Sequence, residues 1–254
     1  MLRGLVTALR TLTILPVPGR DAQDLAAALP WFPLVGGLIG AALYGLVLAC
    51  GQLPGGWPAG AALAAVLGGI ILTRGLHLDG LADWADGFGG GRDRESTLRI
   101  MKDPSVGAFG TLALVGVLLA KWAAVARLAE SGAAVWMVAA CVISRTAQVD
   151  LAVMLPYARA EGGTAAAFVL GARSGHRLAA LGLALALGLA AVGPWAAAAL
   201  AAGVILDLAF GLWCCRRVGG VTGDLLGAAS ELVETAILVA CAAPGTRMLE
   251  ITGW

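Results

Sequence analysis

Two long stretches of this chain carry no formal charge. They run from Trp31 to Thr73 and from Leu178 to Leu206. Because a helix rises about 1.5 Å per residue, each stretch is long enough to cross a hydrocarbon layer of about 30 Å. Charged residues make up 13% of the chain, against about 25% in a typical soluble domain. A soluble fold would therefore expose mostly apolar surface, and the sequence predicts a polytopic membrane protein.

The apolar windows predict an all-α bundle in a single domain, residues 1–254, with about seven transmembrane helices plus short interfacial and cytoplasmic helices. The spans are expected at 31–50, 58–76, 106–128, 132–155, 178–193, 195–213 and 226–243. An even number of spans would follow if one of the short C-terminal spans were re-entrant.

The distribution of basic residues predicts how the bundle is oriented. The connections after the first, third and fifth spans contain no Lys or Arg, and only Lys121 and Arg127, near the far end of the third span, weaken the pattern. The opposite connections carry Arg74, Arg92, Arg94, Arg99, Lys102, Arg145, Arg159, Arg173, Arg216 and Arg217. The positive-inside rule places this second group in the cytoplasm.

The N-terminal segment, the cysteines and the net charge indicate no signal peptide, no cysteine-based metal site and no nucleic-acid partner. Arg3 and Arg10 lie seven residues apart in an apolar segment that stops at Pro16, which suits an amphipathic helix on the membrane surface as well as a frayed terminus, and not a signal peptide. The cysteines lack C-x-x-C spacing and are expected to be small buried hydrophobes. A net charge of +1 and the lack of a basic patch interleaved with aromatic residues indicate no nucleic-acid partner.

The largest polar segment, residues 74–105, begins with three aspartates on one helical face. Asp79, Asp83 and Asp86 are spaced i, i+4 and i+7, so they lie within about 40° of one another around a helix. Three carboxylates on one stripe repel each other, and a bound cation is the simplest way to make the arrangement favourable. The segment therefore predicts a cytoplasmic catalytic loop with a metal-binding face.

A basic helix is expected to fold back beside this acidic stripe. Gly87 to Gly91 predict a flexible turn, and Glu95 to Lys102 predict a second helix that ends before Pro104. Arg99 would pair with Asp103 and lie beside Lys102. A phosphorylated substrate that carries a metal would fit between the two helices, although a solvated loop with internal ion pairs is the alternative.

Two further groups of polar residues lie near the ends of later spans. Asp224 and Glu231 share a helical face, and Glu231 and Glu234 lie inside the last apolar span. Each of the two glutamates would cost roughly 2.5–3.5 kcal/mol if it faced lipid, so both are expected to face the bundle interior and to bind or pair with something. Arg145 and Gln148, one turn apart, suit a phosphate or a polar headgroup, and a snorkelling arginine explains them equally well.

These segments resemble the cobalamin synthase family, the adenosylcobinamide-GDP ribazoletransferases. The resemblance rests on HLDGLADWADG (77–87), RIMKDPSVG (99–107) and GVTGDLLGAASELVE (220–234), supported by LTILPVP (12–18) and PWFPLVGG (30–37). It extends over nearly the whole chain. Pro104 departs from the small polar residue expected there, and it should alter only the local turn.

The resemblance implies a transferase that acts late in cobalamin biosynthesis in the cell inner membrane, with its active site facing the cytoplasm. Such an enzyme transfers the cobinamide-phosphate unit of adenosylcobinamide-GDP to α-ribazole or α-ribazole 5′-phosphate, releases GMP and needs Mg²⁺. The expected partners are these two substrates, membrane lipid, further copies of the chain and other corrinoid-pathway enzymes.

The site residues then take roles in a magnesium-assisted displacement at phosphorus. His77 lies two residues before Asp79 and points away from the stripe. It is therefore expected to cap a helix, to donate a hydrogen bond to a phosphate, or to hydrogen-bond a metal ligand without touching the metal itself. The metal ligands are predicted to be Asp79, Asp83, Asp86, Asp224, Glu231 and Glu234. The catalytic residues are predicted to be Asp83, as proton acceptor, with Arg99 and Lys102 on the leaving phosphate. The substrate-binding residues are predicted to be His77, Arg74, Arg145, Thr222, Gly223 and Asp103.

Three other functions share part of this pattern. CDP-alcohol phosphotransferases and prenyltransferases of the UbiA type also use Asp-rich cytoplasmic helices with Mg²⁺, but the Asp-Gly-x-x-Ala-Arg run of the first class is missing here. A cation-coupled transporter would also place acids inside the membrane. Against it, most acids of this chain cluster at one membrane face, and the two halves show no internal repeat.

Overall fold

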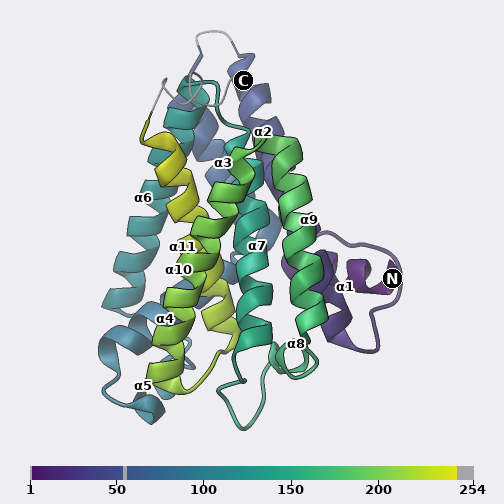
Figure 1. Ribbon diagram of the computed structural model, residues 1–254. Coiled ribbons are helices and arrows are strands. Elements are labelled where there is room, and N and C mark those ends of the chain that lie inside the picture. Colours follow the sequence, from purple (N-terminus) through teal and green to yellow (C-terminus); the bar gives the residue numbers. More distant parts are fainter. Residues whose placement is uncertain (1, 54–55, 245–254) are drawn as a thin grey trace.

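The computed structural model describes residues 2–53 and 56–244, and these are almost entirely helical. Six helices in this part of the chain are long and apolar enough to cross a membrane. They are α2 (Phe32–Gly51), α6 (Ala108–Glu130), α7 (Trp136–Met154), α9 (Ser174–Val192), α10 (Trp195–Val218) and α11 (Gly223–Ala242). Figure 1 shows them side by side as one bundle. The predicted all-α membrane architecture is confirmed.

The second predicted span is broken rather than straight. Helix α3 (Pro58–Thr73) ends at Arg74, whose φ of 58° is left-handed, and Gly75 follows with a φ of 66°. Helix α4 (Leu76–Gly90) then leaves at 90° to α3. Counting this bent pair as a span gives seven spans instead of six. Because of these two left-handed residues, α4 does not continue along the axis of α3. The acidic stripe on α4 therefore packs against the first turns of α11.

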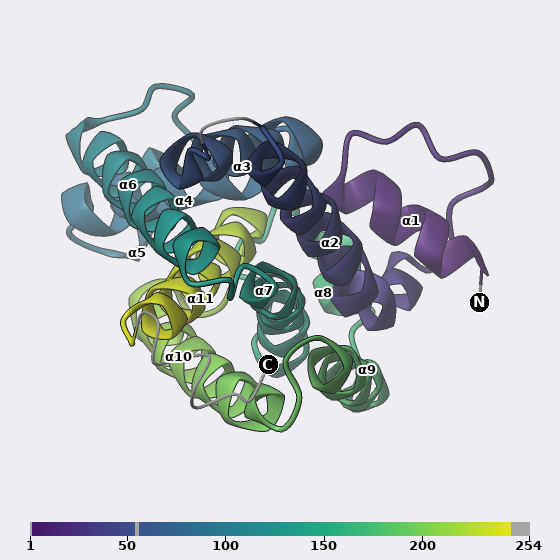
Figure 2. The ribbon, with the colours of Figure 1, turned by 90° about the horizontal axis from the view of Figure 1, so that it is seen from above.

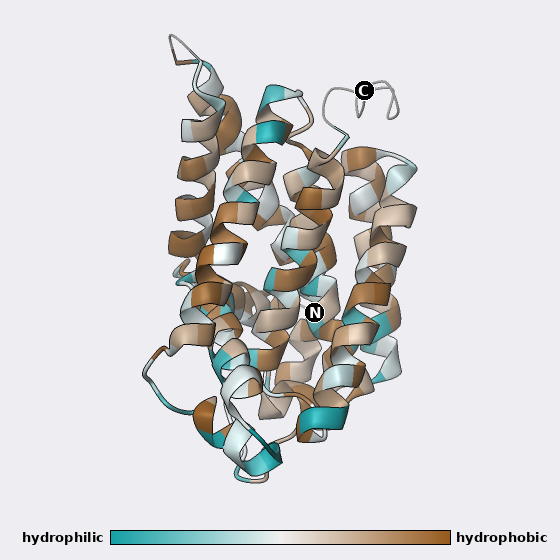
Figure 3. Cartoon of the chain, turned by 90° about the vertical axis from the view of Figure 1, so that its left-hand side faces the viewer, coloured by the Kyte–Doolittle hydropathy of each residue, from teal (hydrophilic) through white to brown (hydrophobic). Residues whose placement is uncertain are grey.

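The polar end of the bundle is formed by α4, by α5 (Arg94–Ile100) and by the loops between the spans. Hydrophilic residues gather at this lower end in Figure 3, and hydrophobic residues dominate the helices above it. We therefore treat α4 and α5 as lying outside the membrane-spanning segments. All sequence-predicted site residues except Arg145, Glu231 and Glu234 lie in this region or next to it.

Helix α7 forms the centre of the bundle. Figure 2 shows it surrounded by α2, α9, α10 and α11, and every residue from Ala139 to Ala152 is buried. Glycines let α2 approach it closely, because a Cβ atom at Gly36 would lie 2.4 Å from the carbonyl oxygen of Cys141. Close contact between helix backbones at small residues is the usual way that membrane helices pack.

The N-terminal residues form a short helix beside the bundle. Helix α1 (Leu2–Leu12) packs on the 3₁₀ helix η1 (Leu25–Trp31), at one side of the molecule in Figure 2. Arg10 holds the connecting loop, because its guanidinium donates to the carbonyl oxygen of Val17 at 2.9 Å and pairs with Asp21 at 3.0 Å. The predicted helix is confirmed, and it is ordered rather than frayed. Helix α8 (Ala166–Leu170) contacts η1 as well.

Candidate active site

The acidic stripe lies on α4, as its spacing predicts, and α4 is longer than expected. It continues through Gly90, so Gly87 to Gly90 are helical and the predicted flexible turn is wrong for them. The glycines allow α5 and its C-terminal residue Met101 to pack on α4. A Cβ atom at Gly87 would lie 2.3 Å from the Cγ atom of Met101. The glycines of this segment are therefore needed because they are small enough for close helix packing, and not because they are flexible.

Asp224 on α11 joins the stripe where α4 and α11 cross. The crossing is tight, because a Cβ atom at Gly80 would lie 2.6 Å from the carbonyl oxygen of Asp224. Burial, followed by the charges of Asp224 and Asp79, raises the pKa of Asp83 to about 7. Two helices therefore bring three carboxylates together, and we call Asp79, Asp83 and Asp224 the acidic group.

A loop contact fixes a cation beside the acidic group. The amide of Val221 donates to the carbonyl oxygen of Pro156 at 2.9 Å, and the amide of Ala158 donates back to Val221 at 2.8 Å. This pairing places Arg159 next to Asp224, with a guanidinium–carboxylate distance of 2.9 Å. The spacing of Arg159 in the sequence indicates no role in the site, because only the fold brings its loop beside α11.

Thr222 and Gly223 lie at the start of α11. Thr222 is fully buried and caps the helix by accepting from the amide of Leu225 at 3.3 Å, and its hydroxyl donates to Asp224 at 3.2 Å. It therefore orients Asp224 and has no exposed surface for a substrate. Gly223, predicted with it as a substrate-binding residue, lines a cavity described below.

Asp86 has a structural partner that its spacing did not predict. Its carboxylate accepts from the amides of Gly107 at 2.7 Å and Gly110 at 2.9 Å, where α6 begins. The first amides of a helix lack partners inside that helix, and a carboxylate is well suited to bind them. Asp86 therefore ties α4 to the start of α6 and is less available to a metal than its neighbours.

Replacing Asp86 by Ala is expected to lower the free energy of unfolding by about 1–2 kcal/mol, as loss of a helix-capping side chain typically does. Asp86→Asn, which keeps one acceptor oxygen, should lose less. Chemical unfolding of the purified variants in detergent measures both. Equal losses for the two variants would show that the negative charge matters more than the hydrogen bonds.

The predicted basic helix is present as α5, but the basic residues predicted to bind phosphate are exposed, and Arg94 instead donates to the carbonyl oxygens of Val218 at 2.8 Å and Ala158 at 2.6 Å. The helix spans Arg94–Ile100 rather than 95–102, and Arg99, Lys102 and Asp103 are exposed. Lys102 pairs with Glu161. Asp103 accepts from the amide of Ser105 at 2.9 Å, and among the described residues no ion pair joins it to Arg99.

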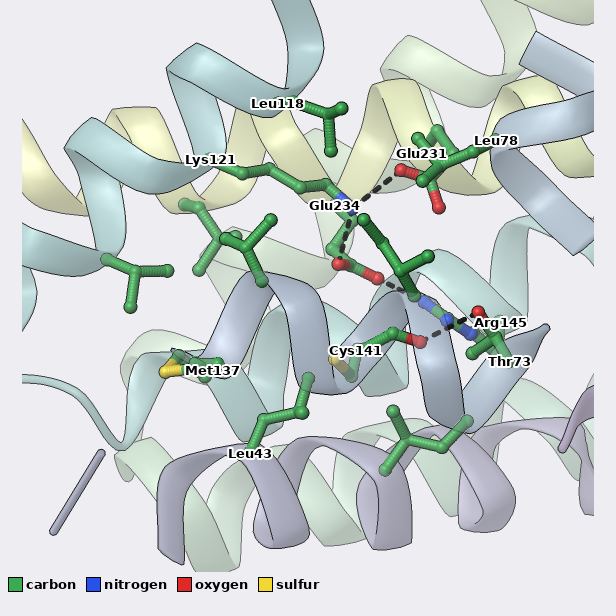
Figure 4. A pocket seen from close by; sticks show the side chains of 17 residues that line it. Leu43, Thr73, Leu78, Leu118, Lys121, Met137, Cys141, Arg145, Glu231 and Glu234 are labelled. Carbon is green, nitrogen blue, oxygen red and sulfur yellow. Dashed lines mark hydrogen bonds and ion pairs between the residues drawn. The ribbon is translucent and has the colours of Figure 1, made fainter. Parts of the chain in front are cut away.

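A second charged group lies among the spanning helices, and Figure 4 shows its side chains converging from three helices. Lys121 of α6 reaches Glu231 of α11 at 2.6 Å and Glu234 at 2.7 Å. Arg145 of α7 pairs with the other oxygen of Glu234. All four side chains are at most 10% exposed. We call Lys121, Arg145, Glu231 and Glu234 the buried charge cluster.

The buried charge cluster balances two cations against two anions. Arg145, Glu231 and Glu234 were predicted to bind substrate or metal, and the structure pairs them with Lys121 and with one another. The sequence signal for Lys121 was a single lysine within an apolar span, which needs an acidic partner on another helix. Sequence analysis treated it only as an exception to the charge distribution.

Two cavities meet at Asp79. The first, of about 430 Å³, lies between α1, α4, α7 and α11 and is lined by Asp79, His77, Gln148 and Asp224, with an apolar wall that includes Phe32 and Phe168. The second, of about 600 Å³, is lined by Asp79, Arg74, Leu78 and Leu114. The predicted substrate-binding residues His77, Arg74 and Gly223 therefore line cavities, whereas Asp103 and Arg145 do not line these two.

The acidic group offers few ligands to a metal. Among residues 2–53 and 56–244, no three His, Cys, Asp or Glu side chains are arranged so that they hold a metal ion by themselves. A magnesium ion keeps several waters and is commonly bound through one or two carboxylates together with substrate phosphates. Asp79 and Asp224, which face the same cavity, fit that pattern of sparse protein ligands.

Comparisons with known proteins give a consistent result. A family model described as cobalamin-5-phosphate synthase matches residues 4–242. The chain is 55% identical to the adenosylcobinamide-GDP ribazoletransferase of Chlorobaculum parvum, over 93% of this chain and 94% of that protein. It is 43% identical to the enzyme of the same name from Syntrophobacter fumaroxidans, over 93% of this chain and 96% of that protein. No solved structure matches it.

Proposed function

The chain belongs to the cobalamin-5-phosphate synthase family and is a membrane transferase of cobalamin biosynthesis, and we propose that it transfers the cobinamide-phosphate unit of adenosylcobinamide-GDP to α-ribazole or its 5′-phosphate. GMP is the second product. The observation that carries the proposal is the acidic group, in which two helices bring three carboxylates together beside Arg159 at the polar end of the bundle. This membership favours the transferase over the phosphotransferase, prenyltransferase and transporter alternatives.

The chemistry that we propose is a displacement at phosphorus. A hydroxyl oxygen of α-ribazole forms a bond to the phosphorus that bears the cobinamide arm, and the bond from that phosphorus to the oxygen of GMP breaks. The hydroxyl proton passes to Asp83, because burial, which raises the pKa of this carboxyl to about 7 in the metal-free protein, makes it a better proton acceptor than an ordinary aspartate. Arg159 beside Asp224, together with Arg99 and Lys102 at the exposed edge, attracts the negatively charged phosphates.

Magnesium is the metal that the donor set fits. Asp79 and Asp224 would hold it, because both line the first cavity and repel Asp83 without a cation between them. When bound, Mg²⁺ supplies positive charge that stabilises the diphosphate and the leaving GMP. Glu231 and Glu234 are left out of this proposal, since Lys121 and Arg145 already balance their charges.

The test of the proposed function is GMP release from the purified protein. Adenosylcobinamide-GDP and α-ribazole are supplied together with Mg²⁺, and each is omitted in turn. GMP should form only when both substrates and the metal are present. Release of GMP without α-ribazole would indicate a hydrolase, and no release with both substrates would refute the transferase reaction.

The affinity for Mg²⁺ is expected to rise with pH between about 6 and 8. Below a pH of about 7 the Asp83 carboxyl is protonated in the metal-free protein, and a cation bound beside it favours the ionised form, so binding releases a proton. Calorimetric titration of Mg²⁺ in two buffers of different ionisation enthalpy measures that proton. Asp83→Asn should bind Mg²⁺ with an affinity that does not change over this range. A wild-type affinity that is equally flat would contradict the proposal.

The orientation that we propose places the acidic group on the cytoplasmic side of the cell inner membrane. The basic residues at the ends of α3, α5 and α10 support it by the positive-inside rule. The same side holds the soluble nucleotide substrates.

A further inference from the structure

The cavity of about 430 Å³ beside Asp79 has two walls of different chemistry. One wall is apolar and carries two phenylalanine rings. Phe32 of α2 and Phe168 of α8 have ring centroids 6.0 Å apart at an interplanar angle of 55°. Both rings line the cavity, Phe32 as a buried residue and Phe168 as a half-buried one. A pair of rings in this arrangement favours a flat aromatic group over a branched aliphatic one.

The opposite wall is polar and includes a group that lacks a partner. His77 is 2% exposed, and neither ring nitrogen has a hydrogen-bond partner in the part of the chain that the structure describes. Buried ring nitrogens are normally satisfied, and both nitrogens are covered here, so a ligand in the cavity supplies the missing hydrogen bonds once the imidazole turns toward it. Gln148, 3% exposed, adds a carboxamide to the same cavity. Both side chains offer donor and acceptor atoms, which is the combination that hydroxyl groups bind.

The cavity ends at the acidic group, because Asp79 and Asp224 line it. A ligand that fills it therefore has an aromatic end, a middle part with hydroxyls and an end that reaches the carboxylates. Resting on the proposed function, we propose that this cavity binds the acceptor nucleoside. Its flat base lies against Phe32 and Phe168, its ribose hydroxyls bind His77 and Gln148, and its reacting hydroxyl lies at the end of the cavity, next to the acidic group that contains Asp83.

The second cavity differs in ways that exclude the acceptor. Among its lining residues are Arg74, Leu78 and Leu114, and none of them is aromatic. It meets the first cavity at Asp79 and Arg74, so the two spaces open on the same carboxylate from different sides of α4. The acceptor and the phosphorus that it attacks can thus reach Asp79 without competing for one space.

Phe168→Leu tests the aromatic wall, because it keeps an apolar side chain and removes only the ring. The dissociation constant of α-ribazole should rise about five- to tenfold, the loss expected for one aromatic contact. Gln148→Met, which keeps the volume and removes the amide, should raise it about tenfold. The matched control is Phe109→Leu, the same change at an exposed ring of α6 outside the cavity. Equilibrium dialysis of α-ribazole with Mg²⁺ and without the donor substrate measures these constants.

The kinetic constants distinguish the possible failures. We expect Phe168→Leu and Gln148→Met to raise the KM for α-ribazole while the KM for adenosylcobinamide-GDP stays unchanged. A raised KM for the donor alone would overturn the proposal and assign the cavity to the donor. Unchanged constants for both substrates in both variants, with wild-type GMP release intact, would also overturn it and leave the proposed function standing. A wild-type protein that releases no GMP would refute the proposed function itself.

Discussion

Asp83→Asn is expected to lower the rate of GMP release at least about 10³-fold, since several kcal/mol of the barrier depend on the proton acceptor and its charge. Asn has the shape of Asp but accepts no proton at neutral pH. The acidic group keeps Asp79 and Asp224, so the metal and both cavities should remain. The measurement is single-turnover GMP release with Mg²⁺ and saturating substrates.

The same substitution is expected to stabilise the metal-free protein at alkaline pH. The folded-state pKa of Asp83, about 7, lies above the ordinary value of 3.8 that the carboxyl has in the unfolded chain. Its contribution to stability is therefore fully present below pH 3.8 and is lost as the pH rises through about 7. Asp83→Asn should match the wild type in thermal unfolding below pH 3.8 and exceed it by a margin that grows until the pH reaches about 7.

A control variant separates loss of chemistry from loss of structure. Asp93→Asn makes the same change at a carboxylate that caps α5 and lies fully exposed. Asn is also a good helix cap, so this variant should retain both activity and stability. If Asp83→Asn retains more than about a hundredth of the wild-type rate, the base is another group, because removing a general base costs about 10²-fold or more.

The acidic stripe could be predicted from the sequence because it depends only on the spacing of residues within one helix. Asp79 and Asp83 are one helical turn apart, and the apolar windows around them fix which segments are helices. The bend between α3 and α4 was not predicted. It depends on the left-handed backbone conformation of Arg74. Non-glycine residues rarely adopt this conformation, and the identity of the residue as arginine does not predict it.

Contacts between distant segments could not be read from spacing. Asp86 shares the stripe with Asp83, yet the fold gives it the amides of Gly107 and Gly110. Glu234 shares a span with Asp224, yet its partners lie on α6 and α7. Helical spacing says which residues share a face, and only the packing of helices decides what that face meets.

Lys121→Met is expected to destabilise the folded protein by about 3–5 kcal/mol, the usual cost of removing one partner from a buried ion pair. Methionine fills a similar volume, so the loss comes from charge and not from a cavity. Within residues 2–53 and 56–244, Lys121 is the only cation that pairs with Glu231, at 2.6 Å, whereas Glu234 keeps Arg145. The uncompensated charge therefore falls on Glu231. Retention of the monodisperse protein after heating in detergent measures the loss.

The identity of the rescuing substitution tests this assignment. Lys121→Met with Glu231→Gln removes both members of one pair and should regain most of the stability. Lys121→Met with Glu234→Gln should regain little, because Glu231 stays without a cation and Arg145 loses its carboxylate. Equal rescue by both would mean that only the net charge of the cluster matters.

The rescued double variant also decides what Glu231 does. We expect it to release GMP at close to the wild-type rate, because the buried charge cluster would then be a device that holds α6, α7 and α11 together. Such a result removes Glu231 from the metal ligands that its helical face suggested. A stable double variant that releases no GMP would instead show that Glu231 takes part in catalysis. Lys121 would then be the cation that positions a catalytic carboxylate.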